Sequence, residues 1–89
     1  MNICNDVLEA AEEVREALSG QQCKVNTGVR NSDGYSGLAV EWDYDLQKYE
    51  VCFYYPRCED RRYSQRALIV AEVLGAVWQA REQQGIEQK

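Results

Sequence analysis

The sequence predicts an α+β fold of the order α-β-β-β-α, in which two helices cover one face of a three-stranded antiparallel sheet. Two observations lead to this prediction. Within residues 35–55, positions 38–45 and 49–55 alternate between two faces, one of them apolar, with the period of two that half-buried strands show. Segments near each end of the chain instead repeat apolar residues every three or four positions, as amphipathic helices do. A sheet with one apolar face needs such a cover, whereas its other face can meet water.

The first helix is expected over residues 3–18, where Ile3, Val7, Val14 and Leu18 recur at helical spacing. Asn5 or Asp6 is a suitable N-cap, and Gly20 is suited to a left-handed C-terminal stop. The face of this helix turned away from the apolar stripe is acidic and carries Glu9, Glu12, Glu13 and Glu16.

Three strands are expected at residues 22–30, 37–44 and 49–55, joined as a meander. Residues 31–34 read Asn-Ser-Asp-Gly, which is strong turn chemistry, and a second turn is expected near residues 45–48. Gly37 is a candidate bulge, and Pro56 ends the third strand because it lacks a backbone N–H. One face of the sheet is predicted to be apolar and the other to be polar.

The second helix is expected over residues 64–84, with Ser64 as N-cap, Gly85 as the stop and a frayed tail at 86–89. It is apolar over much of its girth, so it is expected either to be deeply buried against the sheet and the first helix or to present a second apolar stripe to a partner. Its predicted stripe is Ala67, Val70, Ala71, Leu74, Val77, Trp78 and Arg81. The predicted core of the whole domain is Val7, Val14, Leu18, Val25, Val40, Trp42, Val51, Phe53, Leu68, Leu74 and Val77.

The size and charge of the chain limit the classes of protein to consider. Eighty-nine residues make a single domain, expected over 1–89, and the formal net charge of −5 favours a partner with a basic surface. No apolar run approaches the roughly 18–20 residues that cross a bilayer. Residues 1–13 are acidic and polar, unlike a secretory signal, so we expect a cytoplasmic protein with reduced thiols.

Catalytic and metal chemistry find little support in the residue types present. The chain has no histidine, which removes the commonest general base, and it has no phosphate-binding glycine loop. The four cysteines (Cys4, Cys23, Cys52 and Cys58) include no C-x-x-C pair, and four thiolates would be needed to hold a zinc ion. We therefore expect no enzyme activity, no metal, no cofactor and free thiols.

An acidic group on the second and third strands is the first candidate contact surface. It consists of Glu41, Asp43, Asp45 and Glu50, with Glu9, Glu12, Glu13 and Glu16 of the first helix as weaker candidates. Clustered carboxylates steer the approach of a basic partner. In size, charge and architecture the chain is similar to small phage-encoded inhibitors, notably anti-CRISPR proteins. That resemblance implies a protein that occupies the nucleic-acid-binding groove of a host complex.

The basic residues Arg57, Arg61, Arg62 and Arg66 lie within ten positions and offer a second hypothesis. The α-β-β-β-α order with basic residues opening the last helix resembles the double-stranded-RNA-binding domain, which implies phosphate contacts by this cluster. The basic, histidine-bearing loop of that family is replaced here by the acidic residues 31–34. A third hypothesis is a homodimer formed through surplus apolar surface on the last helix or through an exposed sheet edge.

Overall fold

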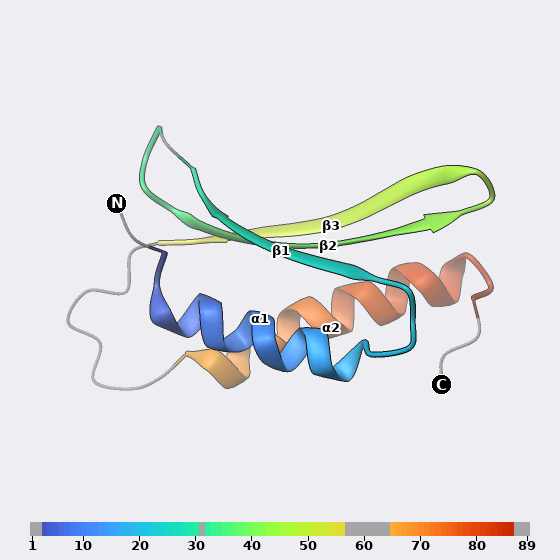
Figure 1. Cartoon of the computed structure of the whole chain (residues 1–89), viewed down its shortest axis with the longest axis horizontal. Coiled ribbons are helices and arrows are strands. Elements are labelled where there is room, and N and C mark those ends of the chain that lie inside the picture. Colours follow the sequence, from blue (N-terminus) through green and yellow to red (C-terminus); the bar gives the residue numbers. More distant parts are fainter. Residues whose placement is uncertain (1–2, 31, 57–64, 87–89) are drawn as a thin grey trace.

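The computed structural model describes residues 3–30, 32–56 and 65–86, and it confirms the predicted α+β order. The elements are α1 (Asn5–Ala17), β1 (Lys24–Val29), β2 (Ser36–Tyr44), β3 (Gln47–Tyr55) and α2 (Arg66–Gln83). Figure 1 shows both helices on the same side of the sheet, with the other side open.

The sheet is an antiparallel meander with the strand order β1-β2-β3. Val25 of β1 faces Val40 of β2, and Val40 faces Val51 of β3. The turn between β2 and β3 is shorter than predicted, because pairing continues to Tyr44 opposite Gln47. Only Asp45 and Leu46 remain between the strands.

Gly37 does not form the predicted bulge. The pairing runs unbroken through it, with Gly28 on one side and Tyr54 on the other. A Cβ atom at this position would lie 3.0 Å from Cε1 of Tyr54. The glycine therefore gives the tyrosine ring room to lie against the sheet.

The core lies between the sheet and the two helices. Leu38 and Val40 of the sheet are fully buried, as are Val7, Val14, Val73 and Val77 of the helices. Val51, Phe53 and Leu74, which were predicted in the core, are half-buried against its edge.

The prediction for Leu68 is wrong, since its side chain is 67% exposed. The buried stripe of α2 instead runs through Ile69, Val73, Val77 and Arg81. Leu68 precedes Ile69 by one residue, which turns it about 100° away from that stripe.

The N-terminal ends of both helices differ from the predicted caps. Cys4 is the N-cap residue of α1 and makes no side-chain cap. The Asp6 carboxylate instead accepts a hydrogen bond from the backbone N–H of Gln65, the N-cap residue of α2, at 2.8 Å. One carboxylate therefore ties the starts of both helices together. The predicted cap Ser64 lies outside the described residues.

The glycines at the helix ends behave as predicted. Gly20 and Gly85 have φ values of 84° and 80°. After α2, the N–H of Gly85 bonds to the carbonyl of Glu82, and the N–H of Ile86 bonds to the carbonyl of Arg81. This pair of bonds is a Schellman motif, which satisfies the last carbonyl groups of the helix.

The described cysteines differ in oxidation state. Cys23 and Cys52 are free, as predicted. The prediction of a free thiol is wrong for Cys4, which is disulfide-bonded. Cys58 lies outside the described residues. None of the helices described here is both long and apolar enough to cross a membrane.

Candidate functional site

The outer face of the sheet lies on the side away from both helices (Figure 1), and paired residues form three rows across it. The first row crosses the strands as Lys24, Glu41 and Glu50. The second row is Asn26, Ala39 and Cys52, and the third is Gly28, Gly37 and Tyr54. As predicted, this face is more exposed than the inner one.

The first row brings Glu41 of β2 directly opposite Glu50 of β3. Two carboxylates at opposed positions of an antiparallel pair repel one another and destabilise the pairing. Lys24, opposite Glu41 on the other side, offsets part of this repulsion. The fold gains nothing from the Glu41–Glu50 pair, which is the kind of feature that a binding surface retains.

The turn between β2 and β3 carries the other two predicted acids. Asp43 lies opposite Lys48, so its charge is partly balanced within the hairpin. Asp45 is in the turn itself with φ 51°, and it is exposed. We call Glu41, Asp43, Asp45 and Glu50 the acidic hairpin.

Leu46, at the tip of this hairpin, was not among the predicted site residues. Its side chain is fully exposed, and its φ is 65°. Two-residue turns with positive φ at both positions favour Asn-Gly, and a leucine in this conformation costs roughly 1–2 kcal/mol. No pattern in the sequence marks this position, because its conformation follows from the length of the turn.

Aromatic residues support the hairpin behind its tip. The rings of Trp42 and Tyr49 are stacked with centroids 6.4 Å apart, and the ring of Tyr44 lies 6.3 Å from Tyr49. The indole N–H of Trp42 donates to the Gln84 side chain at 2.9 Å. These contacts fix the hairpin to the end of α2.

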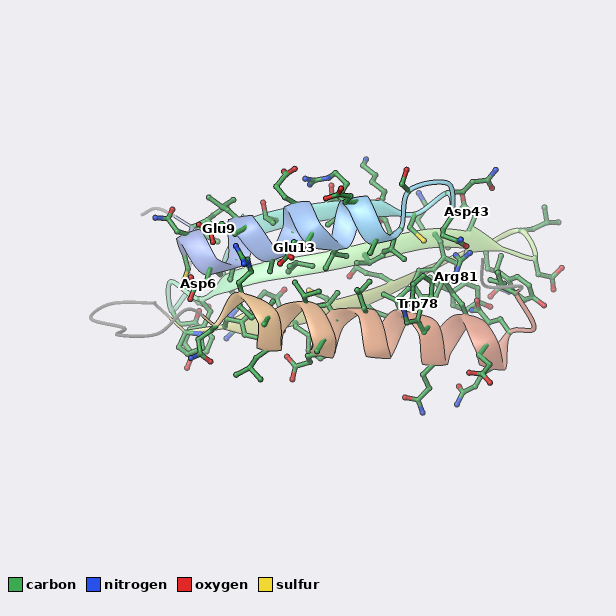
Figure 2. All side chains as sticks on the ribbon, turned by 90° about the horizontal axis from the view of Figure 1, so that it is seen from below. Asp6, Glu9, Glu13, Asp43, Trp78 and Arg81 are labelled. Carbon is green, nitrogen blue, oxygen red and sulfur yellow. The ribbon has the colours of Figure 1, made fainter. Side chains whose placement is uncertain are left out.

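A cavity of about 210 Å³ lies beside the hairpin, between it and the segment after α1. Arg81, which is labelled in Figure 2, lines this cavity and is almost completely buried. Its guanidinium donates to Sγ of Cys23 at 3.4 Å and to the carbonyl oxygen of Gln21 at 3.3 Å, and it lies 5.6 Å from the Trp42 ring centroid. Burial raises the pKa of the Cys23 thiol, and the charge of Arg81 opposes that shift.

These contacts give Arg81 a structural role. Its partners are a thiol, neutral oxygens and an indole face, and its Nε atom has no partner among the described residues. The arginine therefore joins the C-terminal end of α2 to the segment that leads into β1. Helical spacing placed Arg81 on the apolar stripe, but the sequence did not indicate these partners.

A second hollow, of about 260 Å³, lies on the outer face around Gly28, Gly37 and Cys52. The guanidinium of Arg30 borders it and lies 4.4 Å from the ring centroid of Tyr54. Asp33 holds that guanidinium through both carboxylate oxygens, and this hydrogen bonding lowers the pKa of Asp33. Asp33 thus balances the charge of Arg30 on one side of the hollow, whereas Glu50 of the acidic hairpin also lines it.

The acids of α1 lie in the helical layer, apart from the acidic hairpin. Glu9 and Glu13 form ion pairs with Arg66 of α2, with N–O distances of 3.6 and 3.1 Å. Glu12 pairs with Arg15 within the helix. Glu16 is exposed. Figure 2 shows Glu9 and Glu13 on α1, on the side facing α2, so most of these charges serve contacts within the molecule.

The arginine cluster is described only in part. Arg57, Arg61 and Arg62 lie outside the described residues. Arg66 is on the first turn of α2 and makes the ion pairs with Glu9 and Glu13. The glutamates of α1 therefore balance the charge of this basic residue at the start of α2.

Within residues 3–30, 32–56 and 65–86, no group of three or more potential ligands is arranged to hold a metal ion. Comparison with known protein families, with curated proteins and with solved structures finds no match for this chain.

Proposed function

We propose that this chain is a non-enzymatic protein-binding module that contacts a basic partner through the acidic hairpin. The observation that carries the proposal is the pairing of Glu41 with Glu50 on the sheet face away from the helices. A basic partner lowers the cost of holding these two carboxylates together. The electrostatic field of the two carboxylates also speeds the association of a basic partner and disfavours acidic partners.

The tip of the hairpin supplies the apolar part of the contact. Leu46 is fully exposed and Tyr44 is 37% exposed, and Asp43 and Asp45 flank them. An apolar anchor surrounded by charged groups matches the usual anatomy of a protein interface, in which a dry centre has a polar rim. The partner that fits has an apolar depression bordered by lysine or arginine.

The narrower form of the proposal is a cytoplasmic inhibitor of phage or prophage origin, similar to anti-CRISPR proteins, that acts on a nucleic-acid-handling complex. Carboxylates held on a sheet can occupy basic sites that otherwise hold phosphates. The support for this form is the charge and small size of the chain. Such an inhibitor competes with nucleic acid for its partner.

A crosslinking experiment tests the proposal. A photoreactive amino acid at position 46 is used to crosslink the partner, which is then identified and purified. Binding to that protein is measured for the wild type and for Glu41→Gln/Glu50→Gln, with Glu16→Gln on α1 as the matched control. We expect the hairpin variant to bind at least tenfold more weakly, equivalent to about 1.4 kcal/mol, and the control to bind normally. Equal affinity of the hairpin variant and the wild type would refute the acidic hairpin as the contact.

The narrower form has a separate readout. Short duplex DNA or RNA, added to the purified complex, should displace this chain from its partner, and a duplex that binds the partner more tightly should displace more of it. If saturating nucleic acid leaves binding unchanged, the inhibitor form fails, whereas the protein-binding module survives.

Direct nucleic-acid binding through Arg57, Arg61, Arg62 and Arg66 remains the alternative. In this case a labelled duplex should shift in a gel at low salt, and the shift should weaken steeply as salt is raised. Arg61→Glu/Arg62→Glu should abolish it. The absence of a shift at low salt would remove this alternative.

A further inference from the structure

The two edges of the sheet differ in what occupies them. β1 is a six-residue edge, and Nη2 of Arg15 donates to the carbonyl of Val25 on its outer side at 3.0 Å. β3 is a nine-residue edge. Among the described residues, no backbone hydrogen bond reaches the outer side of β3. A long unoccupied edge is a template for pairing with another strand.

The contact at Val25 also fixes which groups of β3 point outward. In an antiparallel pair, successive residues direct their N–H and C=O groups alternately toward and away from the partner strand. The Val25 carbonyl points away from β2, so its partner Val40 directs its backbone groups toward Val51 of β3. Glu50 and Cys52, on either side of Val51, therefore direct their N–H and C=O groups to the free edge.

We propose that a second copy of this chain binds along β3 in antiparallel orientation, about a two-fold axis at Val51, and extends the sheet to six strands. In this register, each side chain on β3 meets one that suits it. Lys48 lies opposite Tyr54 of the second copy, Tyr49 opposite Phe53, Glu50 opposite Cys52, and Val51 opposite itself. No like charges meet, and aromatic and aliphatic residues are paired across the axis.

The two neighbouring symmetric registers are less favourable. A shift by two residues in one direction places Glu50 opposite Glu50 of the second copy, which sets two carboxylates against each other. A shift in the other direction places Lys48 opposite Pro56, which has no N–H to donate, and Cys52 opposite itself. The charge pattern of the strand therefore selects the axis at Val51.

Apolar side chains at this edge are incompletely covered within one copy. The partners on β2, Leu38, Val40 and Trp42, are buried, whereas Val51 and Phe53 on β3 are only half-buried. A second copy would cover the exposed parts of these side chains on the inner side of the extended sheet. The interface is isologous, so every contact is made twice. This inference goes beyond the proposed function, because it uses the backbone edge of β3, although Glu50 takes part in both.

The oligomeric state tests the inference. Sedimentation velocity over a wide range of protein concentration should show a monomer–dimer equilibrium. Added salt should strengthen the dimer, because each copy carries a net charge of −5. A monomer at every concentration would overturn the proposal.

Two variants locate the interface. Cys52→Pro removes an N–H that points to the free edge, so the bonds between β2 and β3 are retained while the edge is blocked. Thr27→Pro makes the matching change on the outer side of β1. We expect at least a tenfold weaker dimer for Cys52→Pro and an unchanged dimer for Thr27→Pro, each with a native circular dichroism spectrum. If Cys52→Pro fails to fold, Val51→Lys, which places two ammonium groups at the axis, should dissociate the dimer.

Crosslinking tests the register. In a Cys52→Ser background, Val51→Cys should form a disulfide-linked dimer on mild oxidation, because opposed residues of a non-hydrogen-bonded pair have Cα atoms about 4.5 Å apart. The wild type should not crosslink through Cys52. A dimer that persists in Val51→Lys, or that crosslinks through Cys52, would overturn the proposed interface.

Discussion

Replacing Leu46 with glycine should stabilise the protein, although it removes an apolar side chain. Leu46 is fully exposed, so the substitution forfeits no buried surface. Its φ of 65° costs leucine roughly 1–2 kcal/mol and costs glycine nothing. Glycine loses about 0.5–1 kcal/mol more conformational entropy on folding. The free energy of unfolding should therefore rise by about 0.5–1 kcal/mol, which for a domain of this size raises Tm by roughly 2–8 °C.

Urea unfolding and thermal melts, both followed by circular dichroism, measure this change. Leu68→Gly is the matched control, since Leu68 is also an exposed leucine but lies in a helix. Glycine in a helix costs about 1 kcal/mol, so this variant should be less stable than the wild type. The reasoning fails if Leu46→Gly lowers the unfolding midpoint. If the proposed function is correct, the stabilised variant should also bind its partner more weakly, because the apolar anchor is gone.

Two further substitutions test other contacts. The backbone N–H of Cys4 is buried and donates to Oγ of Ser36 at 2.9 Å. Ser36→Ala removes this acceptor and should lower the free energy of unfolding, measured in urea, by about 1–3 kcal/mol. Ser19→Ala, at an exposed position, should have little effect. Equal stability of these two variants would show that the Cys4–Ser36 bond is not needed. Asp33→Asn keeps the acceptor for the Tyr35 N–H but removes the charge that pairs with Arg30. Hydrogen bonding to Arg30 lowers the pKa of Asp33 below its ordinary value of 3.8. The ion pair therefore contributes its full stabilisation above pH 3.8 and loses it as the pH falls through the lowered pKa. The wild type should be more stable than the variant at pH 7, and the two should be equally stable in strong acid. A difference that is constant over this range would contradict the assignment.

Local patterns predicted which face of the sheet each side chain occupies. Leu38, Val40 and Trp42 are buried and Glu50, Cys52 and Tyr54 are exposed, as the alternation requires. The opposition of Glu41 to Glu50 could not be predicted, because it depends on the register. The register in turn depends on a turn of two residues, where the sequence suggested a longer one.

The sequence pattern predicted less well which face of α2 is buried. Its apolar residues surround much of the helix, so spacing alone could not separate Leu68, which is exposed, from Ile69, which is buried. Which of these two residues is buried depends on the contacts that α2 makes with α1 and the sheet. The same holds for Arg81, whose partners Gln21 and Cys23 are about sixty positions away along the chain. Such partners depend on tertiary packing, which single-sequence patterns do not report.

The order of the elements has a consequence for the newly made chain. Every strand pairs with its neighbour in sequence, so the meander can form from short loop closures. The last helix is joined to the first part of the chain by contacts of long sequence separation, such as the hydrogen bond between Asp6 and Gln65, which are 59 positions apart. Until α2 docks, Val51 and Phe53 lack their cover and the adjoining strand edge is open. A chain released before α2 has docked is therefore at its most prone to aggregation, and rapid docking of the C-terminal helix protects it.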